Sequence, residues 1–116
     1  MSDSFRDLVV WKKSVLLALD VYRATERFPE RERYGLTSQL RKAVVSVSSN
    51  IAEGKGRLTD GEFRQFLGHA RGSLFELETQ IEIATQLGLL ENRRDLIDRV
   101  HDVSRGLWSL IKYLKK

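Results

Sequence analysis

Apolar residues recur at intervals of three and four along most of the 116-residue chain, which is the spacing of one face of an α-helix. The single proline, Pro29, and several glycines separate four such stretches. We therefore predict four helices, over residues of about 8–27, 34–53, 60–87 and 92–115. No stretch shows the alternation of a β-strand, so the predicted fold class is all-α.

Local end signals support these boundaries. Thr59 followed by Glu62 is typical of a capping box at the start of the third helix. Gly54 and Gly56 are predicted to end the second helix and Gly88 the third, since glycine commonly follows a helix. Asn92 is a candidate N-cap for the fourth helix.

The stripe on each helix predicts which face is buried. In the first helix the predicted stripe consists of Leu8, Trp11, Val15, Ala18 and Tyr22. The other three helices carry longer stripes of Leu, Val, Ile, Ala and Phe. Short connections make sequential helices antiparallel, which predicts one up-down-up-down four-helix bundle domain over residues 1–116.

The composition narrows the class of protein. The chain has no cysteine, which excludes disulfides and thiolate metal sites and suits a reducing cytoplasm. No secretory signal is visible, and no apolar stretch approaches the roughly 20 residues of a membrane span. We expect a cytoplasmic protein that does not contact membranes.

The formal net charge of +4 is compatible with nucleic acid, although acidic residues are interleaved with the basic ones. The candidate contacts to a nucleic-acid backbone are Lys12, Lys13, Arg23, Arg27, Lys42, Lys55 and Arg57. Lys55 and Arg57 lie in a Gly-Lys-Gly-Arg segment just before a predicted helix, but its spacing is not that of a phosphate-binding loop. The alternative is an ordinary turn with solvated cations.

Some apolar residues fall on the polar side of their helices. Val9 and Leu16 lie among charged residues of the first helix, and Phe75 lies opposite the stripe of the third. These three are candidate subunit-interface residues, although scattered exposed apolar residues are also normal. Gly68 and Gly72 lie one turn apart in the third helix, where each is unfavourable by about 1 kcal/mol relative to Ala. We interpret this cost as a sign that another helix approaches closely.

Motifs for catalysis or metal binding are missing from the sequence. His69 and His101 are far apart, and neither follows a glutamate by three residues, as the metal sites of helical bundles require. We therefore predict no catalytic residues, no metal and no cofactor. A metal-dependent hydrolase using Glu53 or Glu76 would be the enzymatic alternative.

Several runs resemble the small bacterial four-helix bundle family named for proteins encoded in intervening sequences of large-subunit ribosomal RNA. The matching runs are residues 5–11, 28–29, 34–41, 50–57, 62–67 and 70–78. The most specific of them are Asn50-Ile51-Ala52-Glu53-Gly54-Lys55-Gly56-Arg57 and Ala70-Arg71-Gly72-Ser73-Leu74-Phe75-Glu76-Leu77.

This resemblance implies a four-helix bundle that assembles into a homopentameric ring. It also implies kinship with the accessory variability proteins of diversity-generating retroelements, which bind nucleic acid and a reverse transcriptase. The polar motif positions are expected to form a buried structural network or, alternatively, a surface ligand site. The network residues are Gln39, Arg41, Asn50, Glu53, Arg71, Ser73 and Glu76.

Two functional hypotheses follow. The first is a non-enzymatic homo-oligomer that binds RNA or DNA through basic surface residues. The second is a structural or adaptor module that binds a protein partner without nucleic acid. Salt dependence distinguishes them, because phosphate contacts weaken steeply as salt rises.

Overall fold

Four long helices account for most of the computed structural model, which describes residues 4–91 and 93–115. They are α1 (Val9–Thr25), α2 (Leu36–Lys55), α3 (Asp60–Gln86) and α4 (Arg93–Leu114). Short 3-10 helices, η1 (Phe5–Asp7) and η2 (Glu30–Glu32), precede α1 and α2. The predicted helices are thus all present, and the main differences in extent are a first helix that ends at Thr25 and a second that begins at Leu36.

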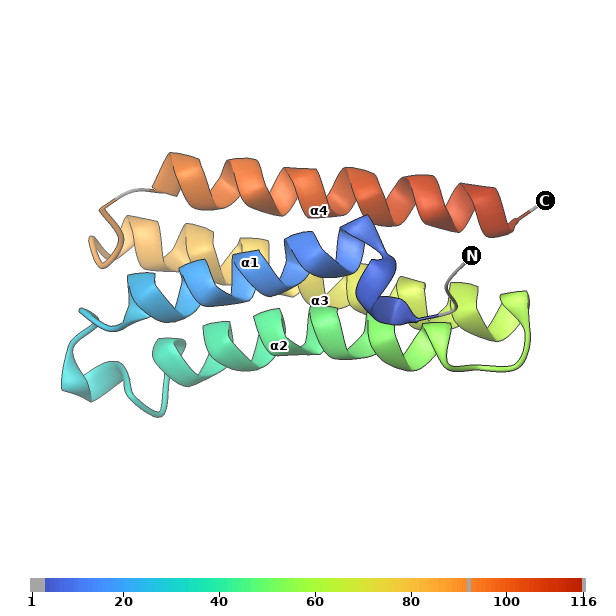
Figure 1. Cartoon of the computed structure of the whole chain (residues 1–116). Coiled ribbons are helices and arrows are strands. Elements are labelled where there is room, and N and C mark those ends of the chain that lie inside the picture. Colours follow the sequence, from blue (N-terminus) through green and yellow to red (C-terminus); the bar gives the residue numbers. More distant parts are fainter. Residues whose placement is uncertain (1–3, 92, 116) are drawn as a thin grey trace.

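The helices run antiparallel in chain order and form an elongated bundle of 44 × 23 × 21 Å (Figure 1). Each helix packs against two others, in the cycle α1, α2, α3, α4 and back to α1. The end of α4 lies at the same end of the bundle as the α2–α3 turn, and η1 lies nearer to this end than to the other (Figure 1). We call this end the terminal end, and the other, which carries the α1–α2 and α3–α4 connections, the loop end.

A single apolar core runs along the bundle. In α2, α3 and α4 it is built from the predicted stripes, which include the fully buried Val44, Leu74 and Leu107. Because each stripe repeats with the helical period, one continuous face of each helix is removed from water.

The predicted stripe of α1 is only partly right. Three of its five residues, Leu8, Trp11 and Ala18, pack against the core, but Tyr22 is 40% exposed. The buried residues of α1 are Val10, Leu17 and Val21, which the predicted stripe left out. The inward face of α1 also carries Ser14, which is fully buried and shares a 2.8 Å hydrogen bond with Ser48 of α2. Because the residue at the centre of this face is polar, the apolar pattern did not identify the face as buried.

The helix ends follow local chemistry. Thr59 is the N-cap of α3, and its hydroxyl accepts a hydrogen bond from the Glu62 backbone N–H at 3.1 Å, as predicted. The end of α3 is closed by Gly88, whose φ of 77° is a left-handed conformation that favours glycine. The Leu89 N–H then reaches back to the Ala84 carbonyl at 2.9 Å. The predicted cap Asn92 lies outside the described residues.

Two expectations about glycines are wrong. Gly54 does not end α2 but lies inside it, buried against α3, where an added Cβ would meet the Phe66 Cβ at 2.7 Å. Gly68 and Gly72 face open space, with nothing within 4 Å of an added Cβ. The close approach of helices therefore occurs at Gly54, and at Gly106 against Val10 of α1. Gly56, the other glycine predicted to end the second helix, is the C-cap of α2.

Within the part of the chain that the structure describes, none of the helices combines the length and apolar character needed to cross a membrane.

Candidate functional site

The seven predicted cations do not form one patch. Lys55 and Arg57 lie at the α2–α3 turn of the terminal end, and Lys12 and Lys13 lie in the first turns of α1. The remaining three occupy other places: Arg23 and Arg27 lie at the loop end, and Lys42 lies on the outer face of α2.

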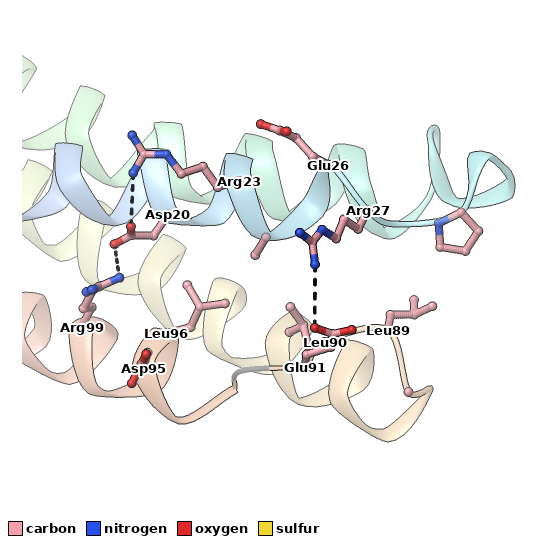
Figure 2. Close-up of a pocket in the computed structure, with 13 residues that line it drawn as sticks. Asp20, Arg23, Glu26, Arg27, Leu89, Leu90, Glu91, Asp95, Leu96 and Arg99 are labelled. Carbon is pink, nitrogen blue, oxygen red and sulfur yellow. Dashed lines mark ion pairs between the residues drawn. The ribbon is translucent and has the colours of Figure 1, made fainter.

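The loop-end cations belong to a pocket in which carboxylates balance the positive charge (Figure 2). The Asp20 carboxylate lies 3.8 Å from the Arg23 guanidinium and 2.6 Å from that of Arg99. Arg27 lies 4.0 Å from Glu91. Because acidic groups line the same pocket, it is a poor receptor for a phosphate.

The lysines are differently placed. No carboxylate of residues 4–91 or 93–115 lies within 4.0 Å of the ammonium groups of Lys12, Lys13 or Lys55. Lys55 lies at the terminal end, whereas Lys12 and Lys13 lie toward the middle of the bundle, beside the contact between Ser14 and Ser48. Arg57 is paired, at 3.4 Å, with the exposed Glu53, and its guanidinium also lies 4.6 Å from the centre of the Phe66 ring.

The end of α4 adds two exposed lysines, Lys112 and Lys115, to the terminal end. They were not among the candidate contacts predicted from the sequence; at the end of a helix, positive charge is also favourable for the helix itself. The sequence did contain a signal for their position, because the basic last turn of the fourth helix must lie beside the α2–α3 turn in an up-down bundle.

The seven polar motif residues do not form one buried network. Gln39, Glu53 and Glu76 are exposed, and the other four are partly buried. This corrects the expectation of a single network, because the residues point to different sides of α2 and α3 and make separate contacts.

Three of these contacts join helices. The Asn50 amide donates to the Ser46 hydroxyl at 3.0 Å, and that hydroxyl lies 2.8 Å from the hydroxyl of Ser73 on α3. The Gln80 amide donates to Gln39 at 3.4 Å.

The third joins α2 to α1. The Arg41 Nε donates to the Thr25 hydroxyl at 2.9 Å, and the Arg41 guanidinium lies 4.6 Å from the centre of the Tyr22 ring. These bonds fix the register of neighbouring helices.

The three candidate interface residues are exposed but lie apart. Val9, 65% exposed, lines the groove between α1 and α4. Leu16 lies on the outer side of α1. Phe75 lies in the groove between α3 and α4.

A further apolar surface was missed, in the groove between α1 and α2. We call it the α1/α2 surface, and it consists of Val15, Leu19, Tyr22 and Val45. Tyr22 was missed because it was assigned to the buried stripe, and Leu19 was missed because it lies beside that stripe.

The histidines do not define a metal site. His101 Nε2 lies 3.5 Å from the Glu78 carboxylate, and the exposed His69 packs edge-on against Phe66. Among the described residues, no three His, Asp or Glu side chains are grouped so that they could hold a metal ion.

One carboxyl is electrostatically distinct. Hydrogen bonds from the Gln86 amide and the Arg93 guanidinium, with the charge of Arg93, lower the pKa of Glu82. Glu82 is therefore held as an anion in the α3/α4 groove.

These features define a class of protein: an all-α four-helix bundle with charged and apolar outer surfaces. Residues 6–109 match the family described as 23S rRNA-intervening sequence protein, and the chain belongs to that family. This confirms the resemblance seen in the sequence.

A solved structure shares the fold. It is a protein of unknown function from the S23 ribosomal protein family of Bacteroides thetaiotaomicron VPI-5482. It is 18% identical with a TM-score of 0.64, and the match covers 91% of this chain and 94% of that one. No curated protein matches. Neither description indicates an enzymatic activity.

Proposed function

We propose that this protein is a non-catalytic, self-associating bundle that binds the backbone of RNA or DNA through the cations of its terminal end. The observation that carries the proposal is the set of terminal-end lysines with no nearby carboxylate. Lys55, Lys112 and Lys115 all lack such a partner among the described residues, and so do Lys12 and Lys13 farther along the bundle. Uncompensated cations attract phosphates. When they neutralise these phosphates, the counterions bound to the nucleic acid are released.

Self-association would strengthen binding to nucleic acid, although the charge of each chain is modest. Each copy adds the same cations, so an assembly presents them repeatedly to one nucleic-acid chain and converts weak contacts into avidity. The exposed α1/α2 surface supports self-association, because large contiguous apolar patches usually mark a contact with another molecule.

We propose that the assembly is the homopentameric ring that the family resemblance implies. A ring requires two different surfaces to meet, one from each neighbouring copy. The α1/α2 surface supplies one of them, and the exposed predicted interface residue Leu16 lies one helical turn before its Leu19.

Light scattering of the purified protein at tens of micromolar tests the assembly. We expect a mass of several chains, and a monomer would refute self-association. Leu19→Asp should shift the protein toward monomer, because it places charge on the α1/α2 surface. Leu87→Asp, at an exposed leucine outside that surface, is the control and should leave the mass unchanged.

Fluorescence anisotropy with structured RNA and duplex DNA, at about 50 and 200 mM salt, tests nucleic-acid binding. We expect affinity to fall by orders of magnitude between the two concentrations. Replacing both Lys55 and Arg57 by Ala should weaken binding and reduce its salt dependence. Replacing Arg23 and Arg27 by Ala removes the same charge from the loop end and should change binding little.

The competing function is a module that binds a protein partner without nucleic acid. No binding at low salt would overturn nucleic-acid binding and leave that function as the better account. Equal losses in the terminal-end and loop-end pairs would place the interface elsewhere than at the terminal end.

A further inference from the structure

Two exposed aromatic rings share one arginine in the groove between α3 and α4. The Arg71 guanidinium lies 4.8 Å from the centre of the Phe75 ring and 5.1 Å from that of Trp108. The Lys112 ammonium lies 5.9 Å from the Trp108 ring. We call these four residues the aromatic strip.

The rings are open to solvent although they are large and apolar. Phe75 is 45% exposed and Trp108 is 48% exposed. Stacking against aromatic faces orients a guanidinium without using up its hydrogen-bond donors. Among the described residues, no carboxylate lies within 4.0 Å of Arg71, so its donors are available to an anionic ligand.

The charge along the groove is polarised. Toward the terminal end, Arg64 of α3 and Lys115 of α4 are exposed at seven-residue spacings from Arg71 and Trp108, which places them on the same helix faces. Toward the loop end, the same face of α3 carries Glu78 and then Glu82, whose carboxylate pairs with Arg93 at 2.8 Å. The aromatic strip therefore continues the cationic terminal end and stops where carboxylates begin to line the groove.

We infer that the aromatic strip binds a single-stranded segment of nucleic acid. Bases stack on Trp108 and Phe75, and the phosphates between them meet Arg71 and Lys112. Alternating aromatic and cationic groups suit a single strand, because every unpaired base offers a face for stacking and every linkage carries a charge. A duplex lacks free base faces and would use only the cations.

This inference rests on the proposed function and refines it. The terminal-end cations would attract any nucleic acid, whereas the aromatic strip would favour single strands over duplexes. The inference also removes Phe75 from the proposed subunit interface, because a base could not stack on a ring that another copy covers.

The test compares a fluorescein-labelled oligouridine of about 12 nucleotides with an RNA duplex of the same length. Anisotropy at low salt gives both affinities for the wild-type chain and for Trp108→Leu and Phe75→Leu. Leucine preserves apolar bulk and favours the helix, so these variants keep their fold. Circular dichroism and light scattering check the fold and the oligomeric state of each variant.

Tyr113→Leu is the matched control. Tyr113 is an exposed aromatic residue of the same helix, 69% exposed. Its position is about 140° around α4 from Trp108 at 100° per residue, so it lies outside the aromatic strip.

We expect each strip variant to bind the oligouridine about 5- to 150-fold more weakly, the range for loss of one stacked base. Duplex affinity should be unchanged, and Tyr113→Leu should bind like the wild type. In a Trp11→Phe background, Trp108 is the one remaining tryptophan, and the oligouridine should quench its fluorescence.

Two results would overturn the inference while leaving the proposed function intact. One is unchanged oligouridine affinity in the strip variants while the Lys55 and Arg57 double variant loses binding. The other is a change of oligomeric state in the strip variants, which would assign the rings to a subunit contact. Failure of the wild-type chain to bind either probe would overturn both proposals.

Discussion

Replacing a glycine inside a helix by alanine should change the stability of the protein, in a direction that depends on the tertiary structure around the glycine. Gly54→Ala should destabilise the protein, whereas Gly68→Ala and Gly72→Ala should stabilise it. All three positions lie within helices, so helix propensity alone favours alanine at each of them.

The magnitudes follow from the space around each position. At Gly54 an added Cβ would lie 2.7 Å from the Phe66 Cβ and 3.2 Å from the Phe63 carbonyl oxygen. Neither atom is the flexible end of a side chain, so α2 and α3 must move apart. Overpacking of this kind costs about 1–3 kcal/mol. The propensity gain of alanine offsets less than its full value of about 1 kcal/mol, because Gly54 is near the end of α2.

At Gly68 and Gly72 nothing lies within 4 Å of the added Cβ. The full propensity gain of about 0.5–1 kcal/mol per site should therefore appear as added stability.

Urea unfolding followed by circular dichroism measures these changes. The midpoint should fall for Gly54→Ala and rise for the other two, with an unchanged slope in urea. Each variant is measured at two protein concentrations, because self-association makes stability depend on concentration. A loss of stability at low concentration in Gly68→Ala would refute the reasoning, as would a gain in Gly54→Ala.

Three further predictions concern single interactions. Thr59→Ala removes the cap of α3 and should lower the free energy of unfolding by about 0.5–2 kcal/mol in urea titrations. Ser14→Ala and Ser48→Ala should each lower it by about 1 kcal/mol. Their double variant should lose less than the sum, because the same hydrogen bond is lost only once. Arg93→Met should raise the pKa of Glu82 toward its ordinary value, as followed by NMR titration, because a hydrogen bond and a favourable charge are removed. Since folding lowers the pKa of Glu82, the stability it contributes is present above the ordinary carboxyl pKa and is lost as pH falls through the lowered one.

Each of these predictions has a clear contrary result. If Thr59→Ala unfolds at the same urea concentration as the wild type, water replaces the cap without cost. Additive losses in the serine pair would mean that the two hydroxyls act independently. An unchanged titration of Glu82 in Arg93→Met would mean that the Gln86 amide alone sets its pKa.

The helices were predictable because their signals are local. The capping pair Thr59 and Glu62, the glycine after α3 and the apolar period of α2, α3 and α4 each involve residues within a few turns of one another. The first helix was the exception. Its apolar residues cover much of its circumference, and the buried Ser14 interrupts the face that packs inward.

The candidate site was only partly predictable. Sequence identified Lys12, Lys13 and Lys55 as cations, but it also included Arg23 and Arg27, whose carboxylate partners come from distant parts of the chain or a neighbouring turn. Charge alone does not say which cations are compensated.

The sequence by itself determined the number, order and antiparallel packing of the helices, because periodicity, caps and short connections act over neighbouring residues. Only the tertiary structure decided that Gly54 rather than Gly68 lies against another helix, and that Phe75 and Trp108 share Arg71. These contacts join residues from different helices. They depend on how the helices are rotated and aligned against one another, which no local pattern encodes.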